Sequence, residues 1–190
     1  MGAEYLPLIR SLMGLDAPIH LFGGFAEDAL LTGSIQRQHG DVDFLVPRTR
    51  LEEGLRVFDE LGFERPEIRF EPSPGMPLAM GTVRDELDLE LGVVDVANDG
   101  AVSFTIPDER DRLHRVLMPI DMFSWPQVEL EGINVRTISP LAQYQIRAGL
   151  SILGSMGPLR PKDVISQAAL RERFFPGVSD ERLQPVVEPI

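Results

Sequence analysis

The sequence predicts an α+β fold: a mixed sheet flanked by helices, followed by a small helical C-terminal region. Apolar residues at helical spacing alternate with short apolar strands over the first 60 residues or so. Strand-like segments then dominate residues 63–138, and helical spacing returns after them. Ser139 is a favoured N-cap residue and Pro140 a favoured first helical residue, so they mark the change. We therefore divide the chain into residues 1–138 and a helical region, 139–190.

The individual elements follow from the same spacing rules. Helices are expected at residues 5–15, 25–31, 51–61, 141–150 and 162–175. Strands are expected at 19–22, 42–46, 63–71, 77–83, 86–96 and 102–106, with a hairpin at 128–138. Thr49 and Glu52 fit a capping box for the third helix, and Asn98-Asp99-Gly100 fits a turn between strands. The proline-rich residues after Gly177 are expected to be loosely ordered.

Composition excludes several kinds of chemistry. The chain has 190 residues and no cysteine, which rules out disulfides, thiolate metal sites and cysteine nucleophiles. Its 30 acidic against 18 basic residues give a net charge of −12, which disfavours nucleic acid as a partner but leaves room for a small cationic substrate. The first residues resemble no signal peptide, and no apolar run is long enough to span a membrane. We therefore expect a cytoplasmic protein.

Asp41 and Asp43 are the first candidates for chemistry. Residues two apart on a strand project to the same face, so both carboxylates should converge on one point. Converging carboxylates repel each other unless a cation or a proton lies between them. Mg²⁺ is a hard cation that binds one or two carboxylates together with phosphate oxygens. The Asp-x-Asp pattern is common by itself, so its neighbours must decide.

Gly23 and Gly24 lie between a predicted strand and a predicted helix. Glycines there allow a ligand to approach the backbone closely, and the start of a helix favours an anion such as phosphate. The alternative is that the pair only makes a tight turn. A phosphate cradle one short helix and a loop before an acidic pair is nevertheless typical of phosphoryl or nucleotidyl transfer.

A third carboxylate is expected from a neighbouring strand. Leu87 to Leu91 alternates strictly, so Asp88 and Glu90 share one face while the leucines fill the other. Acids on strands usually face solvent, and this is the alternative interpretation. Asp95 is the rival third acid. We favour Asp88 because its strand alternates more cleanly.

Three motifs together resemble a known family. Gly-Gly-Phe-Ala-x-Asp at 23–28, Arg-x-His-x-Asp-x-Asp at 37–43 and Leu-Asp-Leu-Glu at 87–90 resemble the aminoglycoside 2''-adenylyltransferase and lincosamide nucleotidyltransferase branch of the polymerase-beta-like superfamily. The likeness covers most of the chain and implies a minimal nucleotidyltransferase fold. Phe25 stands where the family usually has Trp. Leu91 stands where lincosamide enzymes tend to have His-Pro, which leaves the acceptor open.

The resemblance implies the following roles. Asp41, Asp43 and Asp88 would hold Mg²⁺, two ions in all, while Asp88 or Glu90 would accept a proton from an attacking acceptor hydroxyl. The donor would be a nucleoside triphosphate, with ATP favoured. The acceptor would be a hydroxyl-bearing small molecule such as an aminoglycoside-like antibiotic.

Four further residues would support the nucleotide side of the predicted site, together with the amides of Gly23 and Gly24. Arg37 and Lys162 are candidates for countering phosphate charge, although Arg37 could instead pair with Asp28. His39 could orient Asp41 by a hydrogen bond, but for a lone histidine a structural role is favoured. Asp28 is expected to buttress the loop rather than bind metal.

Two other functions remain open. One is a toxin-type nucleotidyltransferase that acts on protein or tRNA, although the acidic charge counts against tRNA. The other is a non-catalytic nucleotide-binding protein of the same fold, which should have lost a metal carboxylate; Asp41, Asp43 and Asp88 are all present. The chain is expected to be a monomer or a homodimer.

Overall fold

The computed structural model describes residues 2–153 and 160–190. Its helices are α1 (Leu6–Gly14), α2 (Gly23–Leu31), α3 (Leu51–Glu60), α4 (Pro140–Ile152), α5 (Pro161–Phe174) and α6 (Asp180–Leu183), with 3-10 turns η1 (Ala3–Tyr5) and η2 (Arg48–Arg50). Its strands are β1 (His20–Phe22), β2 (Val42–Pro47), β3 (Glu67–Phe70), β4 (Ala79–Arg84), β5 (Leu87–Val96), β6 (Val102–Pro107), β7 (Leu113–Met118), β8 (Val128–Leu130), β9 (Ile133–Val135) and β10 (Val186–Pro189).

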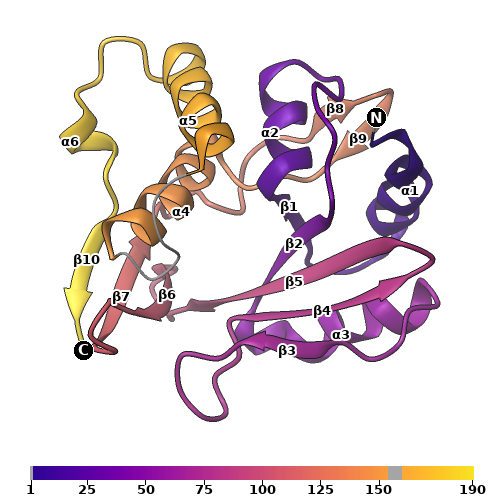
Figure 1. Cartoon of the computed structure of the whole chain (residues 1–190), viewed down its shortest axis with the longest axis horizontal. Helices are drawn as coiled ribbons and strands as arrows, with labels where there is room; N and C mark the ends of the chain where they lie inside the picture. The colour runs from indigo at the N-terminus through magenta and orange to yellow at the C-terminus, as the bar shows by residue number, and fades with distance from the viewer. Residues whose placement is uncertain (1, 154–159) are drawn as a thin grey trace.

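The long strand β5 connects the two parts of the main sheet (Figure 1). The sheet has the order β1-β2-β5-β6-β7-β10, and β4 also pairs with β5 and carries β3 on its other side. The β2–β5 pair is parallel, and the other pairs are antiparallel. This mixed sheet with flanking helices is the predicted α+β fold.

Two apolar cores follow from this path of β5. The first core lies around α1, α2 and α3 and includes Phe25, Phe44 and Phe58. The second lies between β5, β6, β7 and α4, where Phe104 and Met122 are buried. Strand β5 contributes to both cores, which fixes the helix α4 relative to the start of the sheet. The candidate functional site lies along this strand.

The spacing rules located most elements, and the Ser139 cap is confirmed. Ser139 Oγ accepts a hydrogen bond from the amide of Ala142 at 3.3 Å, and Pro140 is the first residue of α4. The prediction of a capping box at Thr49 and Glu52 is wrong. Helix α3 begins instead after a 3-10 turn, with Arg50 at the N-cap position and no side-chain cap.

The end of the chain also differs from the prediction. Residues after Gly177 form α6 and then β10, which pairs with β7 from Val186↔Leu117 to Pro189↔His114. Strand β7 itself was not predicted. Its pattern, Leu-His-Arg-Val-Leu-Met, alternates poorly, and its pairing with β6 and β10 supplies the backbone hydrogen bonds. The C-terminal region therefore contains helices and one strand that returns to the sheet.

Candidate active site

The junction of β1 and α2 explains why two glycines occur there. Phe22 pairs with Asp43 across the β1–β2 ladder, so Gly23 begins α2 directly beside the Asp43 side chain. Gly23 has φ +68°, and a Cβ on it would overlap the Asp43 carboxylate. A Cβ on Gly24 would likewise overlap the ring of His39. Because only glycine fits at both positions, the pair brings the first turn of α2 against the acidic strand.

Four carboxylates gather where β2 and β5 run side by side, and we call them the acidic cluster: Asp41, Asp43, Asp88 and Glu90. Glu90 lies opposite Asp43 in the parallel register. Asp88 is two residues earlier on β5 and therefore on the same face. Asp41 precedes β2 and is exposed. The structure thus brings the predicted acids together and places Glu90, rather than Asp88, directly opposite Asp43.

Within the acidic cluster, Asp43 is the residue whose ionisation the surroundings oppose most strongly. Burial, followed by the charges of Asp41 and Glu90, holds the pKa of Asp43 well above its ordinary value, against an opposing influence from Arg147. Burial also raises the pKa of Glu90, although Arg69 opposes this. Asp43 is therefore short of positive charge, as expected of a group that binds a cation.

Arg69 on β3 supplies the one guanidinium that contacts the acidic cluster among the described residues. Its Nη2 donates to Asp88 Oδ1 at 2.6 Å, and its Nη1 donates to Glu90 Oε2 at 3.0 Å. Hydrogen bonds to these two carboxylates raise the pKa of Arg69 further. Arg69 thus compensates one of the two negative charges of the β5 carboxylates, while Asp43 keeps its repulsive surroundings.

The donor set suits Mg²⁺ chemically. All four side chains offer carboxylate oxygens, which are the ligands of a hard cation, and a bound cation would relieve the repulsion on Asp43. Over residues 2–153 and 160–190, no three His, Asp or Glu side chains already converge as a cation site. Asp88 and Glu90 face Arg69 instead. A cation that used either residue would have to compete with this guanidinium.

A second group of charges, which we call the arginine cluster, lies between α2, α4 and α5: Glu27, Arg37, Arg147, Arg160 and Asp163. Arg147 donates to the buried Glu27 at 2.5 Å and also pairs with Asp163. Arg160 Nε donates to Asp163 at 2.7 Å, and Arg37 lies 3.4 Å from Glu27. Burial disfavours an ionised Asp163, yet Arg160 and Arg147 outweigh it and lower the pKa of this carboxyl.

The two clusters are neighbours. The positive charge of Arg147 opposes the rise in the pKa of Asp43, and the negative charges of Asp41 and Asp43 contribute to the raised pKa of Arg160. Gln143 on α4 adds a direct contact, because its Nε2 donates to the carbonyl of Gly23 at 3.1 Å. Helix α4 is therefore fastened to the start of α2, and it holds positive charge beside the acidic strand.

The other predicted residues fall around these clusters. Arg37 pairs with Glu27 rather than Asp28, and Lys162 is exposed in the first turn of α5. His39 is buried and stacks on Phe25, and its Nε2 lies 2.7 Å from Asp28 Oδ2. Asp28 also accepts from the amide of Gln36 at 3.0 Å. The described contacts of His39 thus lead to Asp28 and the loop rather than to Asp41.

Asp95, the rival acid, lies near the far end of β5. Arg48 Nε donates to its Oδ1 at 2.6 Å, so this carboxylate has its own counter-ion. Sequence reasoning did not select Glu27, Arg69, Arg147 or Arg160. Glu27 lies within the Gly-Gly-Phe-Ala-Glu-Asp motif, and this was the one signal available. The arginines come from segments whose proximity only the fold reveals.

A glycine-led helix beside an Asp-x-Asp strand, with further acids on the next parallel strand, defines the nucleotidyltransferase class. The chain belongs to the aminoglycoside-2''-adenylyltransferase family, whose model matches residues 6–170, and it is a nucleotidyltransferase. In the described residues, no helix is both long and apolar enough to cross a bilayer.

Solved structures share this fold at low sequence identity. ANT(2'')-Ia in complex with adenylyl-2''-tobramycin is 18% identical with a TM-score of 0.65, covering 95% of this chain and 92% of its own. The solution structure of ANT(2'')-Ia is 18% identical with a TM-score of 0.66, and the match covers 96% of this chain and 89% of that one. Lincomycin-bound LnuA, a lincosamide antibiotic adenylyltransferase, is 21% identical with a TM-score of 0.54, and the match covers 80% of this chain and 85% of that one. No curated protein matches the chain in sequence.

Proposed function

We propose that this protein transfers a nucleoside monophosphate, AMP from ATP, to a hydroxyl group of a small molecule, with Mg²⁺ bound by the acidic cluster. The observation that carries the proposal is that two oppositely charged clusters lie close enough for the charges of each to shift pKa values in the other. The acidic cluster has four carboxylates and is contacted by one guanidinium, that of Arg69, whereas the arginine cluster has two carboxylates and three guanidinium groups. The acidic cluster therefore offers negative charge to a metal ion, and the neighbouring arginine cluster offers positive charge to a triphosphate.

Asp41 and Asp43 would hold the cation, with Asp88 or Glu90 as the third ligand. Bound Mg²⁺ would supply charge neutralisation at the α-phosphate and at the leaving pyrophosphate, and two ions are expected. Asp43 is the central ligand, since it is the group whose charge the surroundings oppose most strongly. This arrangement requires Arg69 to release the β5 carboxylate that joins the site.

The triphosphate would lie against the start of α2 and the arginine cluster. The amides of Gly23 and Gly24 lie at the N-terminal end of this helix, where the peptide dipoles favour an anion. Arg160 is exposed, and it lies close enough to Asp41 and Asp43 for their charges to raise its pKa. We therefore propose it as a phosphate contact, together with Arg37 and Lys162. Arg147 is held by two carboxylates and positions α4.

The transfer itself needs a base and an in-line geometry. The acceptor oxygen forms a bond to the α-phosphorus while the bond from that phosphorus to the bridging oxygen breaks, and pyrophosphate leaves. The hydroxyl proton passes to the carboxylate of Glu90 or Asp88. Glu90 is the stronger candidate, because burial raises its pKa and makes it a better proton acceptor than an ordinary glutamate.

The acceptor is proposed to be an antibiotic of the aminoglycoside or lincosamide type. Family membership and the fold shared with ANT(2'')-Ia and LnuA support this class. An adenylyl donor is consistent with the cytoplasmic location expected from the sequence. We expect a monomer or a homodimer.

The proposal can be tested by incubating the purified chain and Mg²⁺ with labelled ATP, GTP, CTP or UTP and a panel of aminoglycosides and lincosamides. We expect pyrophosphate release that depends on one acceptor class and is greatest with ATP. Asp41→Asn should abolish turnover while leaving the melting temperature nearly unchanged. Asp59→Asn, a change on the surface of α3, is the matched control. Unaltered turnover in Asp41→Asn would contradict the metal assignment.

A further inference from the structure

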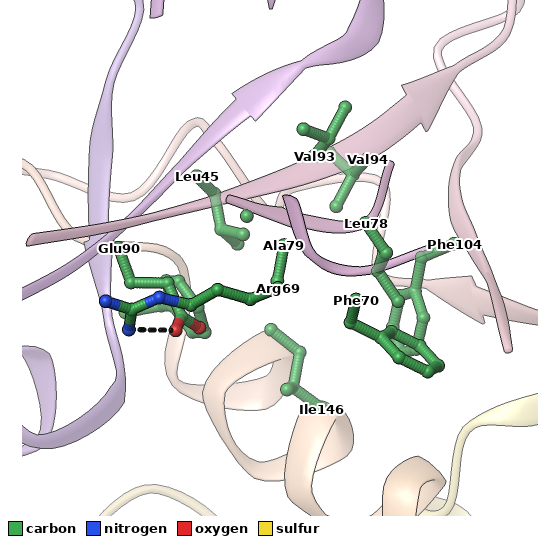
Figure 2. A pocket seen from close by; sticks show the side chains of 12 residues that line it. Leu45, Arg69, Phe70, Leu78, Ala79, Glu90, Val93, Val94, Phe104 and Ile146 are labelled. Atoms are coloured by element: carbon green, nitrogen blue, oxygen red, sulfur yellow. Dashed lines mark hydrogen bonds and ion pairs between the residues drawn. The ribbon is translucent and has the colours of Figure 1, made fainter. Parts of the chain in front are cut away.

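A cavity of about 340 Å³ lies on the face of β5 next to the acidic cluster (Figure 2). Its walls come from β1, β2, β4, β5, β6, the end of β3 and α4, with Phe22, Leu45, Phe104 and Ile146 among them. Two of its lining residues are charged, Arg69 and Glu90, and Figure 2 shows them together at one end. We call this cavity the apolar pocket.

The apolar pocket begins where the acidic cluster ends. Gly81 pairs with Glu90 in the β4–β5 ladder, and two residues further along Ala79 pairs with Gly92, which lines the pocket. Because side chains alternate along strands, Glu90 and residue 92 share one face. Glu90 thus belongs to both the acidic cluster and the pocket. A molecule in the pocket would have one end at this carboxylate.

The local sequence keeps this space open. A Cβ on Gly92 would overlap the end of the Leu45 side chain and touch the ring of Phe22, so glycine leaves both wall residues in place. Protein interiors are otherwise packed to crystal-like density. A space of this size holds about ten waters at ~30 Å³ each, yet its walls offer them few polar partners. It is also within the usual range of ligand pockets.

The wall chemistry discriminates between acceptor groups. An ammonium group in this pocket would lose its hydration, and the one carboxylate in the walls, Glu90, is already paired with the guanidinium of Arg69. A methyl, alkyl or ring carbon group would lose only unfavourable contact with water. The other three carboxylates of the acidic cluster, Asp41, Asp43 and Asp88, lie outside the walls. Charge thus favours an apolar occupant.

We infer that the acceptor is amphipathic: an uncharged apolar portion fills the apolar pocket and places the reacting hydroxyl at Glu90. This inference rests on the proposed function and narrows its substrate class. A uniformly polycationic sugar leaves the pocket unfilled, whereas a hydroxylated molecule with a hydrocarbon arm matches both ends. Any cationic group on the acceptor points away from Arg69, towards the acidic cluster.

A homologous series of alkyl β-D-glucopyranosides from methyl to hexyl, used below micelle-forming concentrations, tests this directly. The hydroxyl groups stay constant while the apolar arm grows. We expect the dissociation constant, measured by calorimetry or ligand-observed NMR on the full chain, to fall about three- to fourfold for each methylene that enters the pocket. Equal affinity for methyl and hexyl glucoside would overturn the inference.

Two variants locate the binding. Ala79→Phe places a ring in the pocket and should remove the gain from the longer arm, while the same change at the exposed Ala101, in the β5–β6 turn, should keep it. Ile146→Thr makes one wall polar and should reduce the gain, and it serves if Ala79→Phe does not fold. A gain that survives in both pocket variants would place the alkyl arm elsewhere and contradict the inference.

The same proteins separate this inference from the proposed function. Binding of Mg²⁺·ATP and pyrophosphate exchange report on nucleotidyl transfer and should be equal in wild type and Ala101→Phe. If ATP is bound but chain length has no effect, the amphipathic acceptor is wrong and the transferase stands. If chain length has the expected effect but ATP does not bind, the apolar pocket stands and the proposed function fails.

Discussion

The acidic cluster and the arginine cluster are built from the same residue types in opposite proportions. At the acidic cluster, Arg69 pairs with Asp88 and Glu90, while Asp43 is left among like charges and has a raised pKa. In the arginine cluster, Arg147 and Arg160 saturate Asp163, whose pKa is lowered. A cluster with spare carboxylate is suited to bind a cation. A cluster with saturated carboxylates holds helices together.

The difference teaches which charges are structural. Glu27 is 2% exposed and Arg147 has a side chain 13% exposed, so their ion pair is removed from water and ties α2 to α4. Arg160, in contrast, has a side chain 63% exposed and can reach a ligand without leaving the cluster. One arginine cluster thus contains both a structural arginine and a candidate binding arginine, and burial tells them apart.

The largest expected effect separates binding from folding. Asp43→Asn should lower turnover about 10³-fold or more, since it removes the central carboxylate of the proposed metal site. Its melting temperature at pH 7 should stay the same or rise, because the substitution removes a charge that burial and Asp41 oppose. Steady-state kinetics and thermal denaturation measure both. A strongly destabilised Asp43→Asn would show that Asp43 has a structural role instead.

The converse is expected in the arginine cluster. Arg147→Met should lower the free energy of unfolding by about 3 kcal/mol, because it leaves Glu27 buried without its close partner. Urea denaturation measures this loss. The surface pair Arg171–Asp180 is the control, and Arg171→Met should cost less than ~1 kcal/mol. Equal losses in the two variants would mean that burial does not distinguish these arginines.

Added Mg²⁺ should stabilise the protein through the acidic cluster. At about 100 times its dissociation constant, a ligand of the native state adds ~2.7 kcal/mol, which is ~5–10 °C in melting temperature for a chain of this size. Wild type and Arg147→Met should both show a rise, and Asp43→Asn should show little. A rise of the same size in Asp43→Asn would place the cation at another site.

The two clusters should respond to pH with opposite signs. Asp43 has a raised pKa, so as pH falls its carboxyl takes up a proton in the native state before it does so in the unfolded state. The contribution of Asp43 to the free energy of unfolding therefore increases as pH falls from the pKa of the folded state towards 3.8. Asp163 has a lowered pKa, so its contribution is present above pH 3.8 and is lost as pH falls through its folded pKa.

Asp43→Asn and Asp163→Asn isolate these contributions. The stability difference from wild type, measured by urea denaturation from pH 3 to pH 7, should have opposite signs for the two variants at pH 7. As pH falls, the difference should shrink for Asp43→Asn down to about pH 3.8 and for Asp163→Asn only below that pH, on the order of 1.4 kcal/mol for each pKa unit of displacement. Differences of the same sign at pH 7 would contradict the contrast between the clusters.

Much of the site could be predicted from local pattern. Alternation placed Asp88 and Glu90 on one face, and the glycine pair lies where expected, at the start of α2 directly after the strand β1 that pairs with β2. Local pattern failed where partners were distant. The 3-10 turn before α3 replaced the capping box of Thr49, and β10 forms because it pairs with β7, about 70 residues earlier in the chain. The roles of the individual site residues remain predictions.

The sequence by itself determined the class of this protein, because the glycine pair, the Asp-x-Asp strand and the alternating Asp88–Glu90 strand are short-range patterns with fixed geometric consequences. The tertiary structure decided how the charges are shared. Arg69 reaches the β5 acids because β3 joins the sheet beside β4, and Arg147 reaches Glu27 because α4 packs on α2. Counter-ions act through space, and their distance along the chain, 21 and 120 residues here, carries no local signal.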